Sequence, residues 1–352
     1  MTLQRYFADR IRTNGPISFA EYMSDCLIHP KFGYYATQQP FGTKGDFTTA
    51  PEISQMFGEL IGLALAQSWV DQGTHARISV VELGPGRGTL MTDALRAAKA
   101  VPGFLENADL YLIEASKALQ DVQREQLSEY KLHFLSSAAD LPNQPLYFVA
   151  NEFFDALPVR QFVRTEAAWR ERLVGLDADV LSFGLGPETQ QPALAHRTDD
   201  TRDGDLVEHR PAAALAMAEL SARISAFGGA GVIIDYGAWR SLGDTVQAVR
   251  AHKPIGVLDA PGSSDLTAHV DFEALALASH APTSQLTPQG VFLERLGITP
   301  RARRLANQLS GDALDQHIQA HRRLTHPAEM GNLFKVLGLF PKGQRPPPGL
   351  EE

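Results

Sequence analysis

A glycine-rich turn between an apolar run and a helix-forming stretch places the strongest constraint on the fold of this chain. The apolar run 78–81 predicts a buried strand, Glu82 follows it, and residues 90–98 predict a helix. Three glycines lie within residues 84–88. Glycine lets the backbone approach a ligand closely because it has no Cβ. The pattern therefore predicts a nucleotide-type site at the carboxyl end of a sheet strand.

The spacing of the glycines separates two classes of nucleotide site. A dinucleotide-binding turn has its third glycine three residues after the second, where this chain has Thr89. Here the glycines alternate instead, at Gly84, Gly86 and Gly88. With Glu82 before them, they resemble motif I of the class I S-adenosyl-L-methionine (SAM)-dependent methyltransferases. That resemblance implies that the acid stands near the amino acid end of SAM; an ordinary glycine-rich strand-to-helix turn is the alternative.

Composition bounds the class of protein. The chain has 352 residues, of which 44% are hydrophobic, enough for a sizeable core. Its net charge of −9 does not favour non-specific nucleic acid binding. The single cysteine, Cys26, excludes an internal disulfide and a cysteine-based zinc site, so we expect no metal site and a reducing compartment. We find no run of transmembrane length and no signal peptide, and therefore expect a cytoplasmic protein.

Polar side chains follow the later predicted strands. The second strand ends at Glu114, where a carboxylate can accept hydrogen bonds from both ribose hydroxyls of a nucleoside; a helix-start acid is the alternative. The third strand, 132–135, leads into the loop 137–142, where methyltransferases of this class commonly touch the adenine; this chain has Ser137 where an acid is frequent, and a plain loop is the alternative. The fourth strand, 146–150, runs into 151–159, whose two acids and one amide need partners near a core. In an open α/β sheet this loop borders the site of the first strand.

The remaining chain predicts the surroundings of such a sheet. Residues 42–52 are polar and glycine-rich and precede a long helix, so they form either a surface loop or a lid over a ligand. Residues 160–186 have the short segments and polar breaks of hairpins. Strands alternate with helices up to the last two strands, at 284–287 and 333–337, which favours a mainly parallel sheet with both faces covered.

We therefore predict an α/β fold of the class I SAM-dependent methyltransferase (Rossmann-like) type. It has a mainly parallel sheet, an N-terminal helical segment and an antiparallel β insertion. The expected division is a helical and lid segment at 1–75, a core at 76–160 and 228–340, an inserted substrate-side subdomain at 161–227 and a flexible tail at 341–352.

The chain resembles the MidA family of SAM-dependent methyltransferases nearly end to end. The motifs that carry the likeness are SFAEYM (18–23), HPKFGYY (29–35), GDFTTAPEISQ (45–55), ELGPGRG (82–88), NEFFDALPV (151–159) and DF (271–272). This is the family of the mitochondrial complex I assembly factor that methylates a protein arginine. The resemblance implies that this chain is a bacterial relative of that factor and that SAM is its cofactor. It also implies a protein substrate, which in the case of that factor is a complex I subunit.

An arginine substrate makes a specific demand on the site. Its guanidinium is fully protonated at neutral pH, and a carboxylate can grip it and turn one nitrogen toward the methyl group. We predict Glu152 as the principal clamp, with Asp155 assisting. His269, with Asp271 behind it, completes the pocket or takes up the proton; a structural histidine is the alternative.

The same reading gives a cofactor site and leaves other functions open. A small-molecule amine methyltransferase would suit the same acid pair. An assembly chaperone that holds SAM as a structural ligand is a second alternative, a dehydrogenase a distant third, and a homodimer stays open. The residues that we expect to hold the cofactor are Asp46, Thr49, Glu82, Gly84, Gly86, Gly88, Glu114, Ala115, Ala138 and Asn151.

Overall fold

The computed structural model of the chain describes residues 2–37, 49–250 and 253–351. The chain forms two compact units, each assembled from three segments. The insertion unit comprises Met1–Phe47, Asp155–Ala213 and Arg240–Asp271, and the sheet unit comprises Thr48–Phe154, Ala214–Trp239 and Phe272–Glu352. These boundaries differ from the expected ones, because residues 48–75 and 214–227 fall in the sheet unit and residues 240–271 in the insertion unit.

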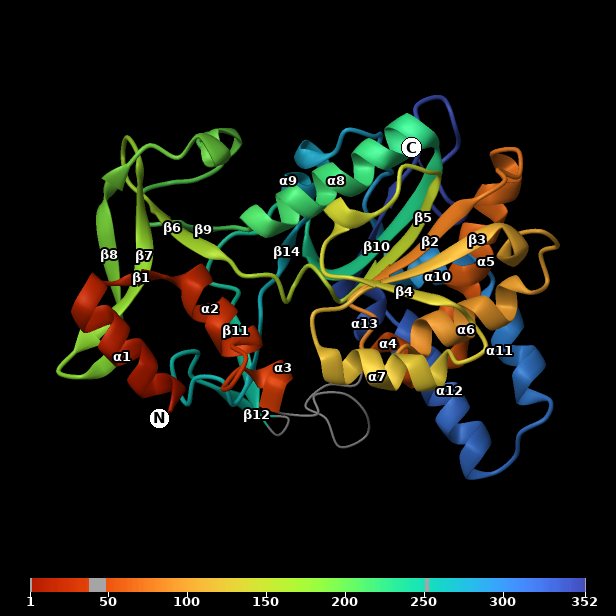
Figure 1. Cartoon of the computed structure of the whole chain (residues 1–352), viewed down its shortest axis with the longest axis horizontal. Coiled ribbons are helices and arrows are strands. Elements are labelled where there is room, and N and C mark those ends of the chain that lie inside the picture. Colours follow the sequence, from red (N-terminus) through yellow and green to blue (C-terminus); the bar gives the residue numbers. More distant parts are fainter. Residues whose placement is uncertain (1, 38–48, 251–252, 352) are drawn as a thin grey trace. The chain divides into compact units, whose positions relative to one another are not determined.

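The sheet unit is built on a mostly parallel sheet, as predicted (Figure 1). Its strands lie in the order β15-β16-β10-β5-β2-β3-β4. Neighbours from β10 to β4 are parallel, whereas β16 runs antiparallel to both β10 and β15. The bounds are β2 (Ile78–Leu83), β3 (Ala108–Ile113), β4 (Leu132–Leu135), β5 (Leu146–Asn151), β10 (Gly229–Ala238), β15 (Thr287–Pro288) and β16 (Phe334–Leu339).

The helix predicted at 90–98 is present as α6. The long helix expected after residues 42–52 is interrupted at Ser54, whose side chain caps the longer part. The helices are α4 (Ala50–Ile53), α5 (Gln55–Asp71), α6 (Thr89–Ala98), α7 (Lys117–Gln126), most of α8 (Pro211–Phe227), α9 (Phe272–Ala278), α10 (Gln289–Arg295), α11 (Ile298–Ala306), α12 (Asp312–Thr325) and α13 (Met330–Leu333), with short 3-10 turns η1 (Leu105–Asn107) and η2 (Ala138–Asp140).

Alternation along the strands gives this unit a core on both faces of the sheet. Val80, Val149 and Val232 face one large apolar cluster, which α5, α6, α10 and α11 complete. Their chain neighbours Val81 and Phe148 are buried as well, and successive side chains of a strand point to opposite faces. Burial on both faces explains why these strands are almost wholly apolar in sequence.

The central helix α5 lies unusually close to α6. It is buried on nearly every side. Gly58 and Gly62 make the close approach possible: a Cβ at Gly62 would lie 2.4 Å from the carbonyl oxygen of Ala94, and one at Gly58 would lie 2.8 Å from Asp93 Cβ. Buried Glu59, between the two glycines, accepts hydrogen bonds from Arg301 and Arg96 and so ties α11 and α6 to α5.

The insertion unit contains the antiparallel hairpins that were predicted. Its larger sheet has the order β1-β7-β6-β9, with β8 paired to β7, and a smaller one has the order β12-β11-β13. Ser18 and Glu21 form a capping box at the start of α2. The elements are α1 (Leu3–Asn14), β1 (Ile17–Ser18), α2 (Phe19–Ile28), α3 (Tyr34–Thr37), β6 (Arg160–Arg164), β7 (Trp169–Asp177), β8 (Val180–Thr189), η3 (Pro192–Arg197), β9 (Leu206–His209), β11 (Gln247–Arg250), β12 (Lys253–Ile255), β13 (Asp265–Thr267) and β14 (Val270–Asp271).

The prediction of a flexible tail at 341–352 is wrong for the residues that the structure describes. Leu350 is buried within the core of the sheet unit. The backbone N–H of Gln285 donates to the carbonyl oxygen of Glu351 at 2.8 Å. Proline content suggested a loose segment, but the prolines flank apolar residues that pack.

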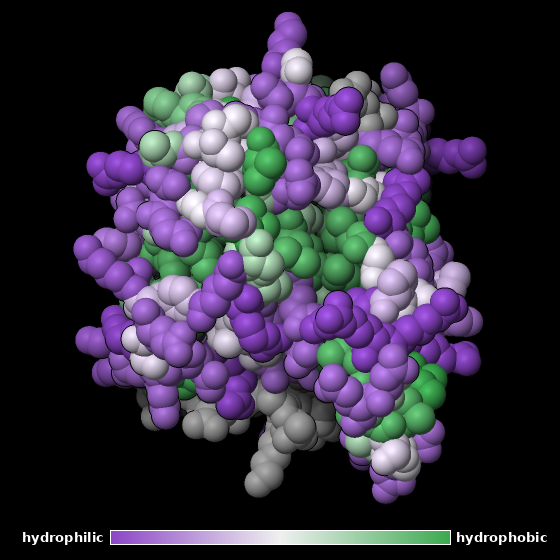
Figure 2. Space-filling model, turned by 90° about the vertical axis from the view of Figure 1, so that its right-hand side faces the viewer, coloured by the Kyte–Doolittle hydropathy of each residue, from purple (hydrophilic) through white to green (hydrophobic). Residues whose placement is uncertain are grey.

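On the face shown in Figure 2, hydrophobic residues reach the surface between hydrophilic ones. Large apolar side chains of the sheet unit that are exposed include Leu63, Ile318 and Leu333. Such scattered exposure is ordinary for folded proteins. In the described ranges, the helices are all too short or too polar to cross a bilayer.

The contact between α5 and α6 generates a stability prediction. Glycine-to-alanine changes in helices normally stabilise by about 0.5–1 kcal/mol. At Gly62 the added methyl group would meet backbone, which cannot move aside, so we expect Gly62→Ala to lower the free energy of unfolding by about 1–3 kcal/mol. Urea unfolding measures it. Gly184→Ala, where an added Cβ meets nothing within 4 Å, is the control, and equal stability of both variants would refute this account of the packing.

Candidate active site

The strand order locates a topological switch point at the carboxyl ends of the strands, where open α/β sheets form a ligand-binding crevice. From β2 the chain adds β3 and β4 on one side, and then returns to add β5 and β10 on the other side. The loops after β2 and β5 therefore leave the sheet in opposite directions. In open α/β sheets, ligands bind at this point, outside the carboxyl ends of the strands.

The turn after β2 is built from glycines in left-handed conformations. Gly84, Gly86 and Gly88 have φ values of 63°, 51° and 82°, which side chains rarely adopt. A Cβ at Gly84 would lie 3.0 Å from the ring of Phe153. Gly88 is the N-cap of α6 and offers no side chain to cap the helix. The left-handed conformation favours glycine at these three positions, so the turn carries no side chains there.

Glu82 is a buried acid beside this turn. Only 3% of the residue is exposed, and its Oε2 atom has no hydrogen-bond partner among the described residues. Burial raises the pKa of Glu82 to about 8, and the charge of Glu114 adds to the rise, while a backbone hydrogen bond from Met91 opposes it. A buried acceptor without a partner is costly in isolation, so this arrangement suits a cationic or hydrogen-bonding ligand.

Glu114 is held at the end of β3 by two partners. The backbone N–H of Ser116 donates to Glu114 Oε1 at 2.7 Å, and Gln123 Nε2 donates to Glu114 Oε2 at 3.3 Å. Burial raises the pKa of Glu114 despite these hydrogen bonds. Gln123 also donates to the carbonyl oxygen of Gly86 at 2.6 Å, so one fully buried amide joins the turns after β2 and β3.

Sequence reasoning missed Gln123. The signal was present, because Gln123 lies four residues after Leu119 and four before Leu127, on the apolar side of α7. A polar residue at such a position is buried and must find partners.

The loop after β5 begins with two polar residues. Asn151 ends the strand and is 8% exposed, and its Oδ1 atom has no partner among the described residues. Glu152 follows with a φ of 51°, in the left-handed region. Its Oε1 atom accepts hydrogen bonds from Asn151 Nδ2 at 3.2 Å and from the backbone N–H of Ala50 at 3.3 Å. Strained backbone of this kind clusters at functional sites.

The remaining predicted cofactor residues have fewer contacts with the glycine turn. Thr49 is the N-cap of α4. Glu52 in α4 accepts a 2.5 Å hydrogen bond from Thr89 Oγ1, which links this helix to the end of the glycine turn. Ala115 follows β3, and Ala138 is buried at the start of η2. Asp46 lies outside the described residues.

Asp155 and His269 both belong to the insertion unit, where Arg210 connects their backbones. The Arg210 guanidinium donates to the carbonyl oxygens of His269 at 2.8 Å and Ala268 at 2.6 Å, and to Leu157 at 3.1 Å. Burial raises the pKa of Asp155 to about 6, although the charge of Arg210 opposes the rise. Burial and Arg210 together lower the pKa of His269, so its imidazole is neutral at pH 7.

Asp271, expected behind His269, has other partners. Its Oδ2 atom accepts hydrogen bonds from Arg197 at 3.1 Å and from the backbone N–H of Ser241 at 3.0 Å. Buried Arg197 also binds Asp200 through Nε and Nη2. The ion cluster thus fixes the backbone next to His269.

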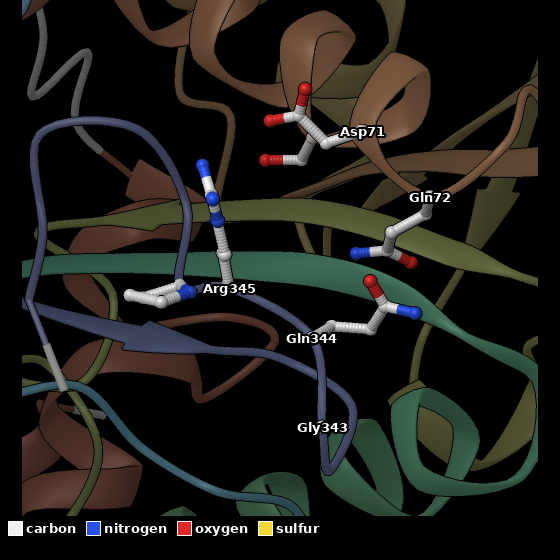
Figure 3. A pocket seen from close by; sticks show the side chains of 7 residues that line it. Asp71, Gln72, Gly343, Gln344 and Arg345 are labelled. Carbon is white, nitrogen blue, oxygen red and sulfur yellow. The ribbon is translucent and has the colours of Figure 1, made fainter.

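A separate cavity of about 300 Å³ lies near the amino-terminal start of β10, away from the carboxyl ends of the strands (Figure 3). Gln72, in its wall, exchanges two hydrogen bonds with Gly229 at the amino-terminal start of β10. The lining is polar and contains none of the predicted site residues: Ser68, Asp71, Gln72, Gly343, Gln344, Arg345 and Pro346.

Comparison with known proteins gives one consistent result. A family model described as “Putative S-adenosyl-L-methionine-dependent methyltransferase” matches residues 60–291. The mitochondrial protein arginine methyltransferase NDUFAF7 from Bos taurus is 38% identical over 96% of this chain and 83% of its own length. The Homo sapiens protein is 36% identical over the same shares. A crystal structure from Burkholderia thailandensis that holds S-adenosylhomocysteine covers 96% of this chain and 90% of its own, with 28% identity and a TM-score of 0.80.

Burial of Glu82 predicts a pH-dependent stability. Because the folded pKa of about 8 lies above the ordinary glutamate value of 4.5, the protein loses stability as pH rises through this interval. Glu82→Gln removes the buried charge, so the ligand-free variant should gain stability over the parent by on the order of 1–4 kcal/mol between pH 5 and pH 9. Urea unfolding at both pH values measures this. Exposed Glu125→Gln is the control, and a difference independent of pH would contradict the assignment.

Proposed function

The chain belongs to the family of SAM-dependent methyltransferases that its motifs indicated, and on that premise we propose that it methylates an arginine side chain of a protein. The observation that carries the proposal is Glu152, an acid in a strained left-handed conformation at the carboxyl end of β5. It stands in the loop across the crevice from the glycine turn. The relatives named as protein arginine methyltransferases, which align over 96% of the chain, support the same substrate class.

The residues at the crevice suit the chemistry of the cofactor. SAM supplies a methyl group activated on a sulfonium, and it carries an ammonium group and two ribose hydroxyls. Glu82 Oε2 and Asn151 Oδ1, both without partners among the described residues, offer acceptors for the ammonium group. Glu114 follows β3, where a carboxylate can accept from ribose hydroxyls. Gly84 and Gly86 place no side chain of their own between the backbone of this turn and the ligand.

Glu152 is suited to hold a guanidinium. The donor of the methyl group is already activated, so the protein must mainly orient the nucleophile and exclude water. A guanidinium presents its N–H groups in a fork that a carboxylate can bind through two oxygens. Such a grip keeps positive charge on the bound nitrogens and leaves the third nitrogen to face the methyl group. The backbone at Ala50 and the amide of Asn151 already fix one oxygen of Glu152.

Asp155 and His269 complete the proposal. Asp155 follows Glu152 by three residues, and with a pKa of about 6 it is mostly ionised at neutral pH and can assist the clamp. His269, neutral because its pKa is lowered, can accept the proton that the nitrogen loses after transfer. We also propose a respiratory complex I subunit as substrate and the cytoplasm as the compartment; the buried free thiol of Cys26 suits reducing conditions.

Removal of one charge tests the clamp. Glu152→Gln keeps the shape of the side chain and an acceptor oxygen, but it loses the charge that binds guanidinium. We expect methyl transfer to fall by about 100-fold or more, with the dissociation constant for SAM changed by less than about threefold. Titration calorimetry measures the dissociation constant for SAM, and incorporation of tritiated methyl groups into protein measures methyl transfer. Glu125→Gln, on the exposed side of α7, should match the parent, and normal transfer by Glu152→Gln would remove Glu152 from catalysis.

Comparison of methylated proteins in cells with and without the gene tests the substrate class. Mass spectrometry of cells with and without the gene should show a mono- or dimethylated arginine that disappears on deletion. Label from SAM that enters a small metabolite instead would favour an amine methyltransferase. A Gly86→Val variant that cannot bind SAM, yet still supports assembly of the respiratory complex, would favour a chaperone.

Protonation of Asp155 should limit activity in acid. The carboxyl group grips a guanidinium only when ionised, and its pKa is about 6. We therefore expect transfer to fall as pH drops below about 6, and Asp155→Asn to have lower activity without this acidic limb. Initial rates between pH 5 and pH 9 at saturating SAM measure it. A limb that persists in Asp155→Asn would assign the ionisation to another group.

A further inference from the structure

A second buried acid, Asp235, lies beside the loop that carries Glu152. Asp235 is in β10 and is fully buried. Its Oδ2 atom accepts a hydrogen bond from the backbone N–H of Phe154 at 3.0 Å, and its Oδ1 atom accepts one from the backbone N–H of Tyr236 at 3.0 Å. Nothing in the proposed chemistry uses this carboxylate, and a buried charge is retained only where its partners compensate for lost solvation.

Two hydrogen bonds fix the chain to β10, one at Glu152 itself and one two residues later. The backbone N–H of Glu152 donates to the carbonyl oxygen of Ile234 at 2.9 Å, which extends the parallel ladder by one residue. Phe154, two residues later, donates to Asp235. The chain must therefore turn sharply between two fixed points on the same strand. A left-handed conformation at Glu152 achieves this turn, at a cost of about 1–3 kcal/mol that the surrounding contacts must offset.

We propose that Asp235 is a positioning residue that holds the Glu152 backbone in its left-handed conformation and so aims the Glu152 carboxylate at the substrate guanidinium. The inference rests on the proposed function. Asp235 touches neither cofactor nor substrate in this scheme; it acts through the backbone of Phe154. Asparagine cannot replace it, because each carboxylate oxygen accepts from an N–H, and an amide would turn its own N–H₂ group toward one of these donors.

The test combines Asp235→Asn with Glu152→Gln in the full chain. The acceptor is total protein from cells that lack the gene, and tritiated methyl groups in methylarginine are counted after hydrolysis. We expect Asp235→Asn to lower transfer by about 10–100-fold, with SAM affinity within about threefold of the parent. The double variant should transfer no less than Glu152→Gln alone, because both changes remove one function. Hydrogen exchange at the Phe154 amide should rise in Asp235→Asn.

Two controls separate positioning from general destabilisation. Glu59→Gln removes a buried carboxylate of the same unit that binds only Arg96, Arg301 and Gln55 among the described residues, so it should lower stability and keep transfer. Asp235→Ser, whose hydroxyl still accepts one N–H, provides a second variant if Asp235→Asn does not fold. Additive losses, or unchanged exchange at Phe154, would overturn the positioning role. A parent protein that binds SAM but methylates nothing would instead overturn the proposed function, and the exchange measurement would still decide the role of Asp235.

Discussion

The parallel ladder between β2 and β5 is the constraint on which the rest of the structure depends. It pairs Glu82 with Val149 and Leu83 with Ala150, so the acid near the end of β2 and the amide at the end of β5 both lie at the carboxyl ends of the strands. The helical connections must leave these ends in opposite directions, since β3 and β4 extend one side and β10 the other. Two polar segments that lie about seventy residues apart in sequence thereby become neighbours at the switch point of the sheet.

Much of the sheet unit could be predicted because its sequence is locally consistent. Apolar runs bounded by an acid or an amide marked β2, β3 and β5, and the glycine spacing marked a turn that only glycine can make. The resemblance to a methyltransferase family rested on motifs that lie in these same turns, and the comparisons confirm it. Residues that act through long-range contacts were less visible. Gln123, Arg210 and Asp235 hold backbone groups that no local pattern specifies.

The less successful predictions share a cause. A flexible tail was inferred from proline content, yet the burial of Leu350 depends on the sheet unit that it meets. The extent of each unit was inferred from changes in composition along the chain, whereas the structure groups segments by their contacts. For Glu152, the sequence predicted a functional role but not the left-handed backbone, since the hydrogen bonds on either side of this residue come from β10. Local pattern predicts elements well, but it does not predict which distant atoms complete them.

The division of the insertion unit into three segments has a consequence for synthesis on the ribosome. Phe7, Phe19 and Tyr22 emerge early, but they share one apolar cluster with Val159, Val174 and Leu266. The strand β1 has its partner in β7, where Ile17 pairs with Val174. During synthesis the N-terminal helices therefore lack these partners until residues 159 to 266 have been added. Apolar surface that stays uncovered for so long favours aggregation, which chaperones counteract.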